Sequence, residues 1–448
     1  MNGGTFTEGI EKQRAGIYFN FKTRAQQRVG LGIRGIVALP VLLSWGEVKK
    51  FIPISSVEDL NKRIGLNVDD KSLLLYREAA KKASTVLLYR LNAGEKARAQ
   101  LGENLRVSAK YGGEKGNEIS VRISENVLEA DKRDVLTFVG TDEVDRQTVS
   151  NSEELINNAY IEFDGEGQME PTAGTFLLGG ENGSANVADY TAFLEAAENE
   201  YFDTIALPVN ENEQLKATFI AFVKRLRDRQ GVKIQGVIAN GRGDHEGIIN
   251  VTEGVVLEDG TEVTPDLATA WVAGASAGAT FNQSLTFVEY EGAVDVINRL
   301  ENDAIVDRMN KGEFLFTYDP RDKTVTVEKD INSLTSFTSD KNKKFSKNKI
   351  VRVLDAINND LTREIKTLIK NRKEAGNDIP ASDDGIQLVM TLITQYMTAL
   401  QDGGGITNFD SETDITIALN EDKDGFLINL AAEPVDAAEK FYFSVGVR

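Results

Sequence analysis

The first part of the chain alternates between apolar and polar stretches in the manner of an α/β fold. Residues 30–43 and 85–91 are mostly apolar stretches of strand length, and residues 71–82 between them read as a helix. A strand, a helix and a second strand in this order are typical of the opening of an α/β domain. The same rhythm returns later, so we expect an α/β core domain formed by residues 26–91 and 180–330.

Between these two parts, short strands and turn residues replace the helices. The strand candidates are residues 107–111, 119–123, 135–139 and 175–178. Only residues 152–158 suggest a helix. Short strands separated by glycine-containing turns are typical of β-sandwiches and barrels. We therefore expect residues 92–179 to form a β-rich, sandwich-like domain that is inserted into the α/β core.

The last region combines long helices with strands. Apolar residues spaced by three or four positions, from Ile350 to Leu368, predict an amphipathic helix with Ser346 as its N-cap. A second helix with the same spacing ends before the glycines at 403–405, and an alternating strand follows it. These patterns predict an α+β C-terminal domain over residues 331–436.

Both ends of the chain carry short strands rich in aromatic and branched side chains. Their residues are Ile17, Tyr18, Phe19 and Phe21 at one end and Phe441, Tyr442, Phe443, Val445 and Val447 at the other. Such strands either pair within their own domain or complete a sheet in a neighbouring subunit, which is β-augmentation. We expect the second arrangement, with residues 1–25 and 437–448 as extended strand arms that polymerise the chain.

Composition narrows the classes of function. The 448 residues contain no cysteine, which excludes disulfides and thiolate chemistry. They contain one histidine, His245, which removes most acid–base and metal chemistry near neutral pH. A net charge of −19 would repel phosphate backbones, so we expect no nucleic-acid partner. No apolar run is long enough to cross a membrane and no signal peptide is visible, so we expect no direct membrane insertion.

Two motifs imitate enzyme sites in the wrong context. Gly30, Gly32 and Gly35 form a GxGxxG, but a dinucleotide site needs a helix after the glycines, and here an apolar strand follows. A nucleotide-binding α/β enzyme that uses these glycines is the alternative function. Ser276 is the centre of a GxSxG, but it lies inside the helix that Thr264 is expected to cap. We expect no enzyme, no catalytic residue and no cofactor.

Two charged clusters have both a functional and a plain interpretation. Asp244, His245 and Glu246 could bind a metal weakly, but a solvated loop is favoured without further ligands, so we expect no metal site. A basic run consists of Lys341, Lys343, Lys344, Lys347 and Lys349. Such a run is usually a solvated loop. However, positive charge at a helix N-terminus opposes the helix dipole, which favours an acidic partner surface.

Four longer stretches occur in a specific order along the chain. They are Lys-Tyr-Gly-Gly-Glu-Lys-Gly-Asn-Glu-Ile-Ser at 110–120, Leu-Gly-Gly-Glu-Asn-Gly at 178–183, Phe-Asp-Thr-Ile-Ala-Leu-Pro at 202–208 and Val-Glu-Lys-Asp-Ile-Asn-Ser-Leu-Thr at 327–335. In this order they resemble the inserted β domain, the central α/β domain and the start of the C-terminal domain of tail sheath proteins from contractile phage tails. The likeness spans nearly the whole chain.

The resemblance implies a structural subunit that forms hexameric rings stacked into a helical sheath around an inner tail tube. Exchanged terminal strands would join the subunits, and contraction would drive the tube through the envelope of a target cell. The implied partners are further copies of the chain, the inner tube protein, and baseplate and tail terminator proteins. The basic run would face the tube. The implied location is the tail of a phage, prophage or phage-tail-like bacteriocin, assembled in the host bacterial cytoplasm.

Overall fold

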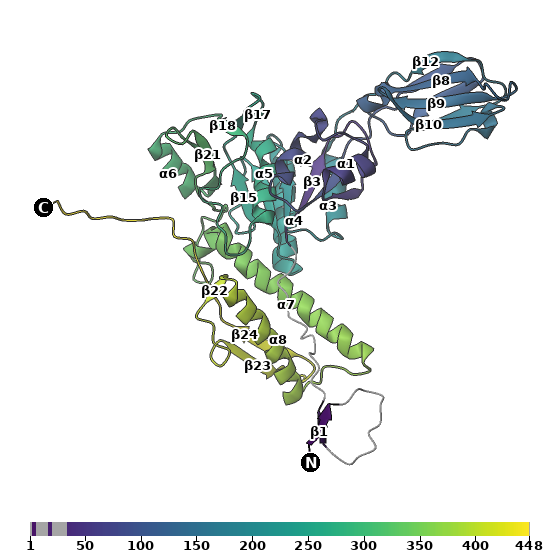
Figure 1. Ribbon diagram of the computed structural model, residues 1–448. Coiled ribbons are helices and arrows are strands. Elements are labelled where there is room, and N and C mark those ends of the chain that lie inside the picture. The colour runs from purple at the N-terminus through teal and green to yellow at the C-terminus, as the bar shows by residue number, and fades with distance from the viewer. Residues whose placement is uncertain (1, 6–16, 20–33, 448) are drawn as a thin grey trace. The chain divides into compact units, whose positions relative to one another are not determined.

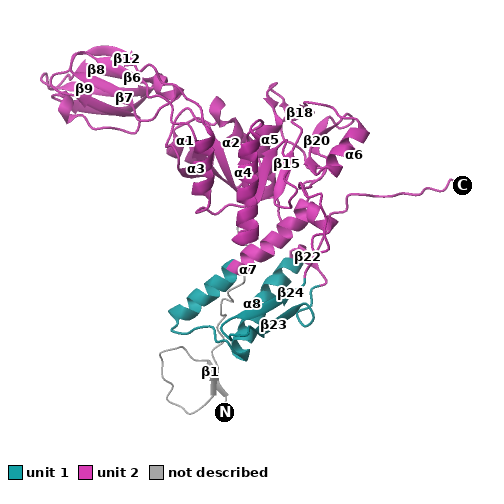
Figure 2. Cartoon of the chain, turned by 180° about the vertical axis from the view of Figure 1, so that it is seen from behind, with its two compact units in different colours: residues 1–31, 363–402, 409–431 teal, residues 32–362, 403–408, 432–448 magenta. Residues whose placement is uncertain are grey.

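The computed structural model describes residues 2–5, 17–19 and 34–447 of the chain (Figure 1). It separates into two compact units (Figure 2). The first unit contains residues 1–31, 363–402 and 409–431, and the second contains residues 32–362, 403–408 and 432–448. Helix α7 (Asn348–Glu374) begins in the second unit and ends in the first.

A seven-stranded sheet forms the centre of the second unit. Its order is β19-β15-β14-β13-β3-β5-β4, and all neighbours are parallel except β4 and β5. The strands are β3 (Ile36–Val41), β4 (Phe51–Ile54), β5 (Thr85–Arg90), β13 (Thr204–Leu207), β14 (Gln235–Ala239), β15 (Ile248–Val251) and β19 (Glu313–Phe314). Two of these, β3 and β5, lie within the apolar stretches that the sequence marks as strands.

Helices cover both faces of this sheet. Successive residues of a strand point to opposite faces, so they join different apolar cores. Val37 and Leu39 of β3 join one apolar core with α1, α2 and α5, whereas Ala38 joins a second core with α3 and α4. The helices are α1 (Val57–Ile64), α2 (Leu74–Ala80), α3 (Val187–Ala197), α4 (Glu213–Lys224) and α5 (Pro265–Gly278). The α/β fold predicted for this part of the chain is therefore confirmed.

Small residues let α5 approach its neighbours closely. A Cβ atom at Gly274 would lie 2.3 Å from the carbonyl oxygen of Ala79, and one at Gly278 would lie 2.1 Å from that of Lys82. Between them, the buried Ser276 hydroxyl donates to Gln235 Oε1 at 2.8 Å. The GxSxG motif is thus a packing surface inside a helix, as its sequence context predicts.

The inserted region consists of two antiparallel sheets, with the orders β10-β9-β8-β12 and β11-β7-β6. The strands are β6 (Arg98–Leu101), β7 (Leu105–Ala109), β8 (Ile119–Glu125), β9 (Arg133–Val139), β10 (Asp142–Val149), β11 (Ile161–Gly165) and β12 (Thr172–Phe176). Val107 from one sheet and Val121 from the other share an apolar core, which confirms a sandwich-like domain. The helix expected over 152–158 is only a 3₁₀ turn, Ser152–Glu154.

Smaller elements complete this unit. A three-stranded sheet has the order β17-β16-β18, and β20 and β21 form an antiparallel hairpin. The bounds are β16 (Val255–Leu257), β17 (Glu262–Val263), β18 (Ala293–Val296), α6 (Asn302–Asn310), β20 (Phe316–Asp319) and β21 (Thr324–Val327). Strand β22 (Ile406–Thr407) pairs with β25 (Glu433–Pro434).

The helices predicted for the C-terminal region are present. Helix α7 begins at Asn348, two residues after the expected cap, because a 3₁₀ turn occupies Lys343–Ser346. In the first unit, α8 (Asp383–Asp402) precedes the hairpin of β23 (Ile415–Leu419) and β24 (Phe426–Leu430). At the N-terminus, β1 (Asn2–Thr5) pairs in parallel with β2 (Ile17–Phe19).

Candidate functional site

The C-terminal segment is the most unusual surface of the second unit. After β25 it contains no helix or strand as far as Val447 (Figure 1). Its large apolar side chains are Phe441, Tyr442, Phe443, Val445 and Val447, which are between 72% and 96% exposed. Contiguous apolar exposure of this kind marks an interaction surface. Within the described residues, no strand of the chain pairs with the predicted C-terminal strand.

The root of this segment is fixed to the fold by polar contacts that the sequence did not reveal. Lys347 Nζ bonds the Asp436 carboxylate and lies 3.6 Å from Glu439 Oε2, and Thr286 Oγ1 donates to Glu439 Oε1 at 2.9 Å. We call these four side chains the arm clasp. The uninterrupted run of exposed residues in the arm begins just after Glu439.

The N-terminal candidates are described only in part. Ile17, Tyr18 and Phe19 form β2, so a strand is present where the sequence predicts one. Its described partner is β1, in a sheet of two strands. Phe21 lies outside the described residues.

The structure separates the five lysines of the predicted basic run. Lys341 donates to Glu246 Oε1 at 2.7 Å, and Lys347 belongs to the arm clasp. Lys349 is 5% exposed, and burial lowers its pKa. Lys343 and Lys344 remain exposed. Of the basic run, therefore, only Lys343 and Lys344 are both exposed and available to an acidic partner.

The hairpin β23–β24 offers open strand edges in the first unit. Each of its strands pairs only with the other among the described residues. Leu427 and Ile428 of β24 are 59% and 37% exposed. A two-stranded sheet is only marginally stable by itself, and its free edges are templates for further strands. The hairpin is therefore a candidate receiver for a strand from another chain.

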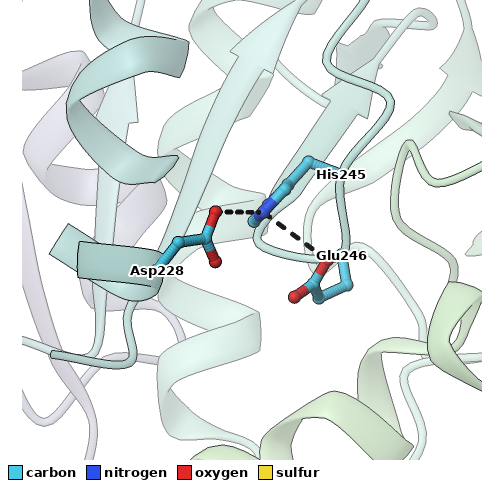
Figure 3. A group of neighbouring side chains, drawn as sticks. All are labelled: Asp228, His245 and Glu246. Carbon is cyan, nitrogen blue, oxygen red and sulfur yellow. Dashed lines mark hydrogen bonds and ion pairs between the residues drawn. The ribbon is translucent and has the colours of Figure 1, made fainter. Parts of the chain in front are cut away.

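Asp228, His245 and Glu246 come together around one ring nitrogen of the histidine (Figure 3). His245 Nε2 lies 3.2 Å from Asp228 Oδ2 and 3.5 Å from Glu246 Oε2. His245 and Glu246 are 7% and 6% exposed. The interpretation of residues 244–246 as a solvated loop was therefore wrong for these two. Asp228 reaches them from a π-helical turn, Arg225–Arg229, at the end of α4.

The hydrogen bonds of the imidazole fit a histidine–carboxylate pair better than a metal ligand. His245 Nδ1 accepts the Gly247 N–H at 3.0 Å, so the ring proton of the neutral histidine is on Nε2 and faces Asp228. A metal-binding histidine usually donates its other ring N–H to a partner, whereas here that nitrogen is an acceptor. Burial lowers the pKa of His245, against the opposing effect of Glu246 and Asp228.

The glycine motif near residue 30 does not lead into a helix. Gly30 and Gly32 lie outside the described residues, and Gly35 precedes strand β3 directly. The Gly35 N–H donates to Asp203 Oδ2 at 2.9 Å. The amide that a pyrophosphate would need is thus bound to a carboxylate of the protein.

Models of phage tail sheath domains match the chain almost from end to end. They are the Gp18 domain III N-terminal region at residues 34–91, the β-sandwich domain at 92–182, the central domain at 183–333 and the C-terminal domain at 340–448. Within the described residues, no helix is both long and apolar enough to cross a membrane.

Relatives agree with these matches. The phage-like element PBSX protein XkdK of Bacillus subtilis (strain 168) is 66% identical, over 100% of both chains. The crystal structure of the sheath tail protein Lin1278 from Listeria innocua is 50% identical, has a TM-score of 0.82, and covers 93% of this chain and 96% of its own. The helical sheath of the anti-feeding prophage in its contracted state is 12% identical, with a TM-score of 0.57 over 97% and 99% of the two chains, and shares the fold.

Proposed function

The chain belongs to the phage tail sheath family, and on that premise we propose that it polymerises around an inner tail tube. Stacked hexameric rings, joined by exchanged terminal strands, would form the sheath, and its contraction would drive the tube through a target cell envelope. The proposed partners are further copies of the chain, the inner tube protein, and baseplate and tail terminator proteins. Assembly would take place in the host bacterial cytoplasm, and no catalytic residue is required.

The exposed C-terminal arm is the observation that carries this proposal. Phe441 and Phe443 are 72% and 87% exposed, although aromatic side chains are normally among the most deeply buried. A neighbouring sheet would cover one face of the arm and satisfy its backbone groups. Each added backbone hydrogen bond contributes only about 1 kcal/mol net, but repetition over many subunits gives a firm lattice.

The β23–β24 hairpin is the receiver that we propose for these arms. Its edges are open among the described residues, and exposed Leu427 offers an apolar contact beside them. A third and fourth strand would convert a marginal two-stranded sheet into a stable one. The proposal therefore accounts for both the exposed C-terminal arm and the open edges of the β23–β24 hairpin.

The test compares the full chain with a variant that ends at Lys440. Electron microscopy and sedimentation at high protein concentration should reveal tubes or rings for the full chain. The truncated variant should keep its melting temperature, because residues 441–447 are exposed, but it should not polymerise. A strictly monomeric full chain, or loss of the fold on truncation, would contradict the proposal.

A matched pair of substitutions tests whether the arm acts as a strand. Alternate residues of a strand face opposite sides, so Phe443→Ser and Tyr442→Ser alter different faces of the same segment. The two side chains have the same exposed fraction, 87%. Phe443→Ser should weaken polymerisation more than Tyr442→Ser, because Phe443 shares its face with Phe441, Val445 and Val447. Equal effects would argue against a strand.

A further inference from the structure

Phe287 has a backbone conformation that its residue type disfavours. Its φ is +64°, in the left-handed region. It occupies the second central position of a turn in which the Val288 N–H donates to the Leu285 carbonyl oxygen at 2.9 Å. A positive φ at this position is normally supplied by glycine or asparagine. A bulky aromatic residue is unusual there and calls for a physical explanation.

Burial of the Phe287 side chain does not provide that explanation, because it is 64% exposed. Hydrogen bonds from neighbouring segments nevertheless fix the turn. The Phe287 N–H donates to the Val327 carbonyl oxygen at 2.8 Å, and the Leu285 N–H donates to Asp330 Oδ2 at 3.0 Å. The Asp330 N–H in turn donates to Thr286 Oγ1 at 3.0 Å. Strained conformations that their surroundings fix in this way are concentrated at functional sites.

The turn also holds the root of the C-terminal arm. Thr286, the residue before Phe287, donates its hydroxyl proton to Glu439 in the arm clasp at 2.9 Å. Phe441 follows Glu439 by two residues, which is about 7 Å of extended chain. The clasp therefore holds the start of the exposed arm and the turn that carries Phe287 at the same part of the second unit.

We propose that Phe287 is an apolar anchor for the second copy of this chain that receives the C-terminal arm. This inference rests on the proposed function. Phe287 follows the clasp residue Thr286, the aromatic part of the arm follows the clasp residue Glu439, and the receiving subunit contacts both. A rigid, exposed aromatic side chain is well suited to such a contact, because little side-chain freedom is lost when it is buried.

The test replaces Phe287 by glycine in the full chain. Glycine adopts a positive φ without strain, so the monomer should keep or raise its melting temperature. The critical concentration for polymerisation, measured by sedimentation, should rise by about tenfold or more, as for the loss of an interface anchor. Phe287→Asn, which tolerates the same backbone conformation, should behave alike.

Lys323→Gly is the matched control. Lys323 has a φ of +57° and is exposed in the β20–β21 turn, but it is not apolar and takes no part in the clasp. Its substitution should leave the critical concentration unchanged. If wild type polymerises and Phe287→Gly does so at the same concentration, the anchor is disproved while the proposed function stands. A lowered melting temperature for Phe287→Gly would assign Phe287 to the fold and would also disprove the anchor.

Discussion

A different hydrogen bond holds each ring nitrogen of His245. Protonation at Nδ1 would remove the acceptor for the Gly247 N–H, which lies 3.0 Å away. The positive charges of Arg227 and Lys341 also lower the histidine pKa, while the carboxylates of Asp228 and Glu246 raise it. Because burial is the largest effect, the neutral form is favoured in the folded chain.

This arrangement predicts a pH dependence of stability. A histidine pKa that is lower in the folded than in the unfolded state gives stability that is fully present above the ordinary value of about 6.5. The free energy of unfolding should fall as pH drops below this value. His245→Asn keeps an acceptor for Gly247 and should remove this part of the dependence. Since the chain has one histidine, its Cε1–H resonance can be assigned directly and gives the pKa by NMR. A pKa above 6.5 would contradict the prediction.

Charge pairs hold the N-terminal part of helix α7 to the second unit. Arg227 forms a bidentate pair with Asp355, at 2.6 and 2.8 Å, and the side chain of Arg227 is only 2% exposed. All residues of α7 that are fully buried lie between Asn348 and Asp360. This part of the helix is therefore held to the second unit.

Removal of one partner from this pair should be costly. Asp355→Asn leaves a buried guanidinium without its counter-charge, which typically costs about 3–5 kcal/mol of stability. Asp295→Asn is the control, because its pair with Arg299 is solvent-exposed and such pairs contribute between about 0 and 1 kcal/mol. Chemical denaturation of the two variants checks the contrast. Equal, small losses would mean that water reaches Arg227.

Regular apolar spacing explains which elements the sequence predicts well. Helices α7 and α8 were found because their buried residues recur every three or four positions. Strand β10 was missed because seven of its eight residues, Asp142–Thr148, are not fully buried, so its composition is polar.

Asp228 could not be assigned to the His245 cluster, since a turn of the fold brings it there across 17 positions. The clasp residue Glu439 gave no pattern either, because its partners Thr286 and Lys347 are distant in sequence.

At the scale of the whole molecule, the chain has a net charge of −19, and the two exposed lysines of the basic run, Lys343 and Lys344, contrast with this acidic background. If Lys343 and Lys344 contact an acidic tube, the double change to glutamate should weaken co-sedimentation with purified inner tube by roughly tenfold at low salt. The difference should shrink as ionic strength rises. The control changes Lys62 and Lys323, which are also exposed, to glutamate. Identical binding of both double variants would remove the lysines from the interface.

The clasp also sets a geometric limit on any polymer built through the arm. Val447 follows Glu439 by eight residues, and a fully extended chain spans at most about 3.6 Å per residue, or about 29 Å. The described part of the arm, as far as Val447, is therefore a tether of at most about 29 Å that begins at the clasp. Two connected subunits can rotate and slide only as far as this tether reaches. In the proposed contraction, each clasp would stay within about 3 nm of the edge that receives its arm.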